Sequence, residues 1–342
     1  MRWAERSAAG LAALGMAAAL AAAPWAAAAQ TATSTRESGT PPAVLDRVVS
    51  DPRITESSGL AVSRRHDGVL WTHNDSGDAA RLYAIGPDGS TLATVTITGG
   101  EPRDLEAMAS SVDANGTPLL WVGDIGDNSG SRVDGILVHR LEEPAELTDA
   151  EVTPTSYRLR YPGSPVDAES LLVDPRDGRL FVATKTPVAG TVYAAPRSLD
   201  PAGANPLEPL GDTPDFLTDG AFLPDGRMLV RGYGAMWAGT PGDGWGEPRE
   251  LPPSDQGESL AVSPDGAAVY VGSEGVRSKV WRLALPAALA PGAVPAPAPS
   301  PGSAPDSTQA YGFAWAVPLL VGGLTLMLTL AILLVRRPGR FP

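Results

Sequence analysis

Five polar side chains stand at equivalent points of a repeated sequence pattern, each at the start of a short apolar run. The runs read SGLAVS, EAMASS, ESLLVD, TDGAFLP and ESLAVS, and their first residues are Ser58, Glu106, Glu169, Thr218 and Glu258. If these side chains converge, the carboxylates cannot all stay ionised unless a cation sits among them or they take up protons. Ca²⁺ accepts several oxygen ligands in a flexible geometry. None of the five residues is His or Cys, which argues against Zn²⁺ and Cu²⁺. The pattern therefore predicts a Ca²⁺ site formed by these residues.

A structural interpretation of the same residues stays open beside the metal site. Their oxygen atoms can equally hydrogen-bond the backbone amides of neighbouring repeats and so hold the repeats together. The two interpretations differ in one measurable respect, because only a metal site gains stability when Ca²⁺ is added.

Each apolar run begins a set of short strands. A turn dipeptide follows every run, and its glycine accepts the positive φ that two-residue hairpins need: Asp67-Gly68, Asn115-Gly116, Asp177-Gly178, Asp225-Gly226 and Asp265-Gly266. Second strands come next (VLWTHN, LLWVGD, LFVATK, MLVRGY, VYVGSE), and then third strands (RLYAIG, GILVHRL, TVYAAP, AMWAGT, KVWRLAL). Helical periodicity is scarce, so the pattern is typical of an all-β protein.

The spacing of the repeats predicts a five-bladed β-propeller. The runs begin roughly 40 to 60 residues apart, which matches four-stranded propeller blades. Fourth strands such as TLATVTI and SYRLRY are recognisable in most blades, but the last blade lacks one. We expect the N-terminal strand AVLDRVV, residues 43–49, to take that place and close the ring, which leaves no open edge. The first strand of each blade then lines the central channel, and the leading residues of the runs converge on its axis.

The order Ser, Glu, Glu, Thr, Glu at the strand starts resembles that of the calcium-activated nucleotidases, or secreted apyrases. SSGLAVS followed by LWTHNDSGDAARLYAI looks like the first blade of that family, with Asn74-Asp75 at its acidic pair, and TDGAFLPDG resembles the fourth blade. A weaker resemblance extends to exported propellers of the phytase-like esterase group. The resemblance implies a five-bladed propeller with an axial Ca²⁺ and hydrolysis of phosphoesters. The family's basic catalytic cluster in the third blade has no clear counterpart here, where LFVATK supplies only Lys185.

The loops after the second strands are expected to surround the axial site, because those strands end on the face where the inner strands begin. The candidate ligand-binding residues on these loops are His73, Asn74, Asp75, Asp124, Asp127, Asn128, Lys185, Arg231 and Tyr233. The candidate catalytic residues are Asp75, Arg103 and Asp104. A simpler interpretation also stays open, since Asp, Asn, Ser and Gly are common in loops because they form turns.

The two ends of the chain predict export and membrane anchoring. Residues 1–29 have the basic head, apolar middle and Ala-x-Ala exit of a signal peptide, and residues 30–42 form a flexible segment before the propeller of residues 43–285. Residues 286–310 form a Pro/Ala-rich stalk. Residues 311–335 are long and apolar enough for a transmembrane helix, and the arginines of the tail, residues 336–342, place that tail in the cytoplasm. The chain has no Cys, so its body must be stabilised by burial.

Charge and motif content narrow the expected function. The net charge of −13 argues against nucleic acid or anionic lipid surfaces as partners. A Gly-x-Ser-x-Gly elbow, a phosphate-binding Gly-Lys-Ser/Thr loop and a His pair with zinc spacing are all lacking in the sequence. We therefore expect a membrane-anchored binding or scaffold module at the cell surface, with an axial Ca²⁺ and an extracellular ligand or protein partner. A Ca²⁺-dependent phosphoester hydrolase is the alternative.

Overall fold

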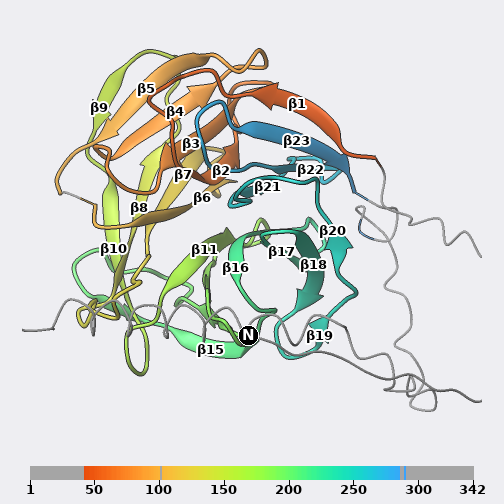
Figure 1. Cartoon of the computed structure of the whole chain (residues 1–342). Coiled ribbons are helices and arrows are strands. Elements are labelled where there is room, and N and C mark those ends of the chain that lie inside the picture. Colours follow the sequence, from red (N-terminus) through yellow and green to blue (C-terminus); the bar gives the residue numbers. More distant parts are fainter. Residues whose placement is uncertain (1–41, 101, 286–288, 290–342) are drawn as a thin grey trace, which may run out of the picture. The chain divides into compact units, whose positions relative to one another are not determined.

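The computed structural model describes residues 42–100, 102–285 and 289 of the chain. These residues fold into five sheets that form the blades of a β-propeller (Figure 1). The secondary-structure elements of the described residues are all β-strands, with no helix among them. The all-β, five-bladed propeller predicted from the sequence is therefore confirmed.

The blades follow one another along the chain. Blade 1 contains β2 (Ser57–Val62), β3 (Leu70–Asn74), β4 (Arg81–Ile85), β5 (Thr91–Ile97) and β9 (Ala150–Val152). Blade 2 contains β6 (Leu105–Val112), β7 (Pro118–Asp124), β8 (Ile136–Glu142), β10 (Thr155–Arg160) and β14 (Ala204–Pro206). Blade 3 contains β11 (Ala168–Val173), β12 (Leu180–Thr184), β13 (Thr191–Ala194) and β15 (Glu208–Asp212). Blade 4 contains β16 (Leu217–Phe222), β17 (Met228–Gly232), β18 (Ala235–Thr240), β19 (Gly244–Trp245) and β20 (Arg249–Glu250). Blade 5 contains β21 (Leu260–Val262), β22 (Ala268–Val271), β23 (Lys279–Ala284) and β1 (Val44–Val48).

The inner strands form a closed ring. Each inner strand contacts the inner strand of the next blade: β2 contacts β6, β6 contacts β11, β11 contacts β16, β16 contacts β21, and β21 contacts β2. Five clusters of buried apolar side chains fill the spaces between successive blades. Between blades 1 and 2, for example, Trp71 packs with Met108 and Leu120, and each is at most 1% exposed. Burying a large apolar side chain contributes roughly 1.5–3 kcal/mol, so the clusters between blades hold the ring together.

The last blade is completed by the N-terminal strand, as the sequence predicted. β1 pairs antiparallel with β23 and forms the outer edge of blade 5. Arg47 on β1 is 7% exposed and donates to the backbone oxygens of Gly68, Ile85 and Gly86 in blade 1, at 3.0, 2.9 and 2.9 Å. One strand therefore joins the last blade to the first.

The turns between first and second strands contain the predicted glycines, but they are longer than two-residue hairpins. Gly68, Gly116, Gly178, Gly226 and Gly266 all have positive φ, between 66° and 88°. In the turn after β16, the backbone bond from Leu223 N to Arg227 O encloses several residues, and Asp225 Oδ1 accepts from Arg227 N at 3.0 Å. The longer loop is favoured because the Asp side chain caps the turn internally.

Two edge strands were not predicted by the sequence pattern. β9 pairs in parallel with β5, although the chain has already entered blade 2 when it forms β9. β14 pairs in parallel with β10 in the same manner, one blade further along. The chain thus adds a short outer strand to blade 1 after it has entered blade 2, and another to blade 2 after it has entered blade 3.

The predicted signal peptide, transmembrane helix and tail lie outside the described residues, and so does the predicted stalk apart from Leu289. Within the described residues, no helix is long and apolar enough to cross a membrane.

Candidate cation site on the propeller axis

The residues predicted to face the axis are all buried. Their exposed fractions are 1% for Ser58, 4% for Glu106, 3% for Glu169, 0% for Thr218 and 2% for Glu258. In the first four blades the strand register shifts where these residues stand, between Ser57 and Leu60, Leu105 and Ala107, Ala168 and Ser170, and Leu217 and Asp219. A β-bulge redirects a side chain that would otherwise follow the strand alternation. The repeated bulges therefore explain how one polar residue per blade departs from the apolar pattern.

The two hydroxyl groups of this set bond across blade boundaries. Ser58 Oγ donates to Glu106 O at 3.2 Å and lies 3.3 Å from Glu106 Oε2. Thr218 Oγ1 donates to Gly257 O at 3.0 Å. These bonds agree with the structural interpretation of both residues, and their predicted role as metal ligands stays a prediction.

The most compact acidic group combines Glu106 with two residues from the surrounding loops. Ligand oxygens of Asp75, Asp104 and Glu106 all lie within 4.8 Å of one another. Glu106 is buried, while Asp75 and Asp104 are half-buried. Among the described residues, no Lys or Arg is ion-paired with any of the three, and Asp75 Oδ1 is buried without a hydrogen-bond partner. Oxygen faces oxygen here, which is repulsive until a proton or a cation intervenes.

Backbone bonds fix the loops that carry this group. Asp75 N donates to Glu56 O at 3.0 Å, and Leu105 N donates to Asp75 O at 3.2 Å, which ties the end of β3 to the start of β6. Asp104 N donates to Asp124 Oδ1 at 2.9 Å. The positions of Asp75 and Asp104 are therefore set by contacts within and between blades 1 and 2.

The pKa values of the group follow from burial and from like charge. Burial, followed by the charges of Glu169, Asp75 and Asp104, raises the pKa of Glu106 to about 10. Burial and the hydrogen bond and charge of Asp104 raise the pKa of Asp75 to about 7. Without a cation, Glu106 therefore holds a proton at neutral pH, and a bound cation would displace it.

Glu169 is neutralised differently, by an internal cation. Lys185 Nζ lies 2.9 Å from Glu169 Oε1 and 5.4 Å from the centre of the Tyr233 ring. Burial raises the pKa of Glu169 to about 8, although Lys185 opposes that shift. Burial lowers the pKa of Lys185, but the Glu169 carboxylate outweighs it and raises the value overall. Lys185 and Tyr233 thus lie beside Glu169, with the ammonium group committed to Glu169, and their predicted role in ligand binding stays a prediction.

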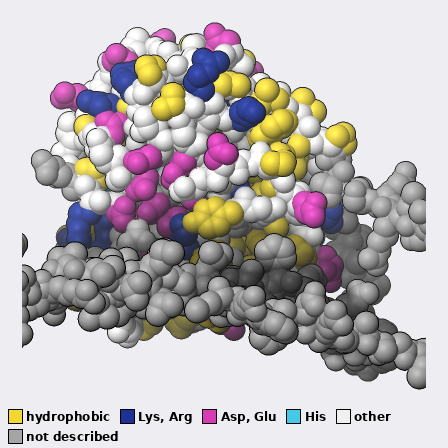
Figure 2. Space-filling view, in the orientation of Figure 1, with side chains coloured by type: hydrophobic (Ala, Val, Ile, Leu, Met, Phe, Trp, Pro, Cys, Tyr) yellow, Lys and Arg dark blue, Asp and Glu magenta, His cyan; other side chains and the backbone are white. Residues whose placement is uncertain are grey.

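Glu258 and Glu274 extend the acidic ring into blade 5. Glu258 Oε1 accepts from Gln256 Nε2 at 2.9 Å, while Oε2 is buried with no hydrogen-bond partner among the described residues. Burial raises the pKa of Glu258. Burial and the charges of Glu258 and Glu56 raise the pKa of Glu274 to about 7. Acidic side chains also gather near the middle of the face seen in Figure 2, beside basic and hydrophobic ones.

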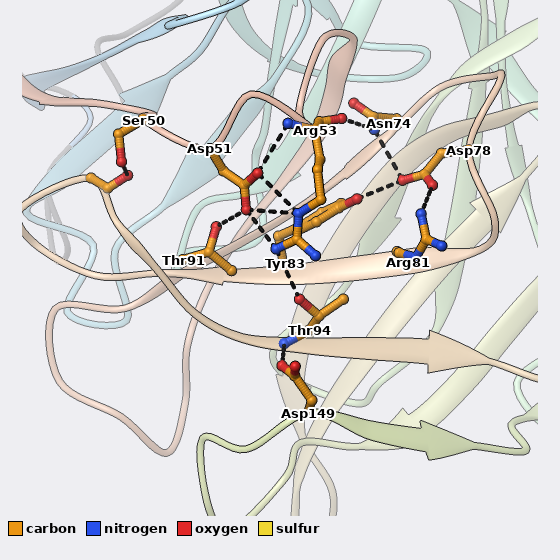
Figure 3. Close-up of polar contacts among 11 residues, drawn as sticks. Ser50, Asp51, Arg53, Asn74, Asp78, Arg81, Tyr83, Thr91, Thr94 and Asp149 are labelled. Carbon is orange, nitrogen blue, oxygen red and sulfur yellow. Dashed lines mark hydrogen bonds and ion pairs between the residues drawn. The ribbon is translucent and has the colours of Figure 1, made fainter.

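Asn74 supports the loop that carries Asp75. Its Oδ1 accepts from Thr55 N and Glu56 N, both at 3.0 Å. Its Nδ2 donates to Arg53 O at 2.8 Å and to Asp78 Oδ2 at 3.0 Å (Figure 3). All the polar atoms of the Asn74 amide are thereby used within blade 1, so Asn74 positions its neighbour.

The carboxylates of Asp124 and Asp127 likewise accept hydrogen bonds from nearby residues of the chain. Asp124 is 1% exposed, and its Oδ1 accepts from Arg132 Nη2 at 2.5 Å as well as from the backbone of Arg103 and Asp104. Asp127 accepts from the backbone N–H groups of Ser131 and Arg132 at 2.8 and 3.0 Å. Both carboxylates therefore shape the loop after β7, in agreement with the turn-forming interpretation.

The remaining predicted residues differ widely in exposure. Arg231 is 1% exposed and donates to the backbone oxygens of Ser259 and Gly272 at 3.0 and 2.9 Å, which joins blades 4 and 5. His73 is fully buried, and burial lowers its pKa to about 4. Asn128 and Arg103 are exposed, and Arg103 Nη2 donates to Ser131 Oγ at 2.9 Å. Of these residues, the structure brings none into the compact acidic group.

Asp219 and Arg132 are buried and charged, but they were not identified from the sequence. Asp219 is 0% exposed and accepts from Leu260 N at 2.6 Å across the boundary between blades 4 and 5. Arg132 is 4% exposed and pairs with Asp124. Asp219 directly follows Thr218, whereas the residue after the leading polar residue is Gly, Ala or Ser in the other four repeats. This difference was the sequence signal that could have identified Asp219.

Comparison with known proteins identifies no family. No family model matches the chain. Endoglucanase B of Cellulomonas fimi is 26% identical over 204 residues, which cover 54% of this chain and 19% of that enzyme. The match thus spans less than a fifth of the length of that relative.

Several solved structures are similar to part of this chain, each with a TM-score below 0.5. A gluconolactonase from Xanthomonas campestris is 14% identical with a TM-score of 0.43, over 71% of this chain and 88% of the other. A luciferin-regenerating enzyme is 12% identical with a TM-score of 0.41, over 67% and 78%. Virginiamycin B lyase from Staphylococcus aureus is 11% identical with a TM-score of 0.37, over 72% and 74%. At these TM-scores the similarities carry no conclusion about this chain, and the resemblance to calcium-activated nucleotidases stays an expectation from the sequence.

Proposed function

We propose that the protein binds a divalent cation on the propeller axis and uses it to anchor an extracellular ligand. Ca²⁺ is the expected ion, and Asp75, Asp104 and Glu106 are its carboxylate ligands. The observation that carries the proposal is the approach of these oxygens to within 4.8 Å of one another, with Asp75 Oδ1 left unpartnered. A cation at this point would relieve the repulsion that otherwise requires protonation of Glu106.

The chemistry of the ligands supports Ca²⁺ over softer metals. The group offers only carboxylate oxygens, which suit Ca²⁺. His73, two residues before Asp75, is not part of the group and is fully buried, with its Nδ1 3.0 Å from Asn74 O. Ca²⁺ takes 6 to 8 oxygen ligands, more than three carboxylates supply as single donors. Because Asp75 and Asp104 are half-buried, the remaining positions are open to water or to oxygen atoms of a ligand.

Binding is favoured over hydrolysis of phosphoesters because the nearby Lys and Arg side chains are already bonded within the protein. Phosphoryl transfer needs positive groups to stabilise the charge of the transition state. Lys185 is paired with Glu169, and Arg231 is bonded to backbone oxygens. A Ca²⁺-dependent hydrolase with Asp75, Arg103 and Asp104 is the second candidate, supported by the exposure of Arg103 directly beside Asp104.

Calorimetric titration of the purified full-length protein with Ca²⁺ tests the proposal. We expect one bound ion per chain, a higher melting temperature in Ca²⁺ than in chelator, and loss of both effects in Asp104→Asn combined with Glu106→Gln. Glu142→Gln is the matched control, since Glu142 is 64% exposed and pairs with Arg65 away from this group. Absence of Ca²⁺ binding by the folded protein would rule out the site.

A second assay separates the two candidate functions. The Ca²⁺-loaded protein is incubated with nucleotides and with simple phosphate esters, and released phosphate is measured. Release above that of the Asp104→Asn variant would establish the hydrolase and exclude a purely binding role.

A further inference from the structure

A groove between blades 1 and 2 offers a second site of opposite charge. Its volume is about 500 Å³, within the range of small-molecule sites. Ile97 and Thr98, at the end of β5, line it from blade 1, and residues of β8 and β10 line it from blade 2. It is separate from Asp75, Asp104 and Glu106, which do not line it.

Strand alternation places three polar side chains in a row along this groove. Ser156, Arg158 and Arg160 are two residues apart on β10, so they share one face of the strand, and all three line the groove. His139 on the neighbouring β8 pairs with Ser156 in register, and His139 Nδ1 lies 2.8 Å from Ser156 Oγ. Burial lowers the pKa of His139, so the positive charge of the groove comes from the two arginines. Asp124 also lines the groove, but it is 1% exposed and its carboxylate is paired with Arg132.

The two guanidinium groups are only weakly engaged by the protein. Arg158 Nη1 reaches Asp134 O at 3.4 Å, and Arg160 Nη2 lies 3.9 Å from Asp134 Oδ1. The side chains of Arg160 and Asp134 are 53% and 79% exposed, and ion pairs that exposed contribute little. Each guanidinium carries five N–H donors, so most of them remain available to a ligand. Arg158 and Arg160 also place two like charges on one face of the strand, and an anion between them would relieve their repulsion.

Small residues keep the space in front of the arginines open. Ala80, Gly100 and Ala204 line the groove together with the apolar side chains of Ile97 and Leu137. A Cβ added at Gly100 would meet no atom within 4 Å. The groove thus combines a positively charged row with apolar walls and free volume.

We propose that this groove binds a small organic anion. Its carboxylate or phosphate group would be held by Arg158 and Arg160, because the planar guanidinium matches both anions in a bidentate manner. Ser156 supplies a further hydroxyl group, and the body of the ligand would lie against Leu137 and Ile97. The protein would then bind a cation on its axis and an organic anion at the boundary of blades 1 and 2.

Titration of the full-length protein with glucose 6-phosphate, glucuronate and glucose tests this site. We expect the phosphate or the carboxylate probe to bind with a Kd of about 1 mM or below, more weakly as salt is raised, and neutral glucose not to bind. The probe that binds more tightly identifies the anionic group. Failure of both anions to bind, or equal binding of glucose, would overturn the proposal.

Variants locate the binding in the groove. Arg158→Gln combined with Arg160→Gln should weaken binding at least tenfold, and Gly100→Trp should do the same by filling the open volume. Arg197→Gln should leave it unchanged, since Arg197 lies outside this groove and its side chain is 72% exposed. Equal losses in Arg197→Gln would show a nonspecific charge effect and refute the site. Unchanged melting curves confirm that each variant folds, and Glu106→Gln should bind the anion normally.

Discussion

Gly126 packs directly against the carboxylate of Asp104. A Cβ on Gly126 would lie 2.5 Å from Asp104 Oδ2 and 2.6 Å from Glu106 Oε1. Such distances are shorter than real Cβ contacts, so any side chain here would displace one or both carboxylates. The loop after β7 therefore sets the spacing of two of the three proposed cation ligands.

Gly126→Ala should weaken Ca²⁺ binding about tenfold or more, because the added methyl group moves the Asp104 and Glu106 oxygens apart. Calorimetric titration of the variant measures the change. Gly163→Ala is the control, since a Cβ at Gly163 would meet no atom within 4 Å and should leave the affinity unaltered. Equal affinities in the two variants would contradict the assigned ligands.

The cation-free protein should lose stability as pH rises from about 4 to about 8. The folded state raises the pKa of Asp75 from 3.8 to about 7 and that of Glu169 from 4.5 to about 8. Between these values the folded state binds more protons than the unfolded state, so the free energy of unfolding falls with pH. Carboxyls with lowered pKa, such as Asp51 at about 2, act in the opposite direction but only below pH 4. Buried His73, with its pKa lowered from 6.5 to about 4, also opposes the trend between these values, but it is outnumbered by the carboxyls with raised pKa.

Urea unfolding in chelator at pH 5 and pH 8 measures this dependence, and saturating Ca²⁺ should reduce or reverse it. Asp75→Asn should show a weaker dependence because it removes one of the titrating groups. A cation-free protein that became more stable between pH 5 and pH 8 would contradict the burial of uncompensated carboxyls on the axis.

Lys185→Met should destabilise the propeller by about 3 kcal/mol, because it leaves the buried Glu169 without its ion-pair partner. Urea unfolding gives the change in the free energy of unfolding. The double variant Lys185→Met, Glu169→Gln should recover much of the loss, since it removes both charges. A single variant as stable as the original protein would show that the pair is not needed for folding.

Arg231→Met should also destabilise the fold, by about 3 kcal/mol or more. The substitution keeps an apolar chain of similar length but removes the charged donors to Ser259 O and Gly272 O, each contributing about 1.5–3 kcal/mol. Thermal unfolding checks this. Arg249→Met, on the half-buried β20, serves as the comparison and should change the melting temperature far less.

The sequence determined the repeating units of this protein. Strand alternation and Asp-Gly or Asn-Gly turns depend on residues close together in the chain, so the blades, their inner strands and the closing role of β1 could all be predicted. The same repetition identified Glu106, because a polar residue at the start of an apolar strand departs from its local pattern.

Only the tertiary structure decided which oxygens meet on the axis. Asp75, from the loop after β3, joins Asp104 and Glu106 because bulges and bonds between blades set their distances, and no local pattern encodes such distances. The tertiary structure likewise decided that Asn74, Asp124 and Arg231 hydrogen-bond to other residues of the chain. A buried polar group takes whichever partner packing brings within reach. Burial also determines charge, since the pKa of Glu106 is raised to about 10 first by burial and then by charges that include those of Glu169 and Asp75 on other blades.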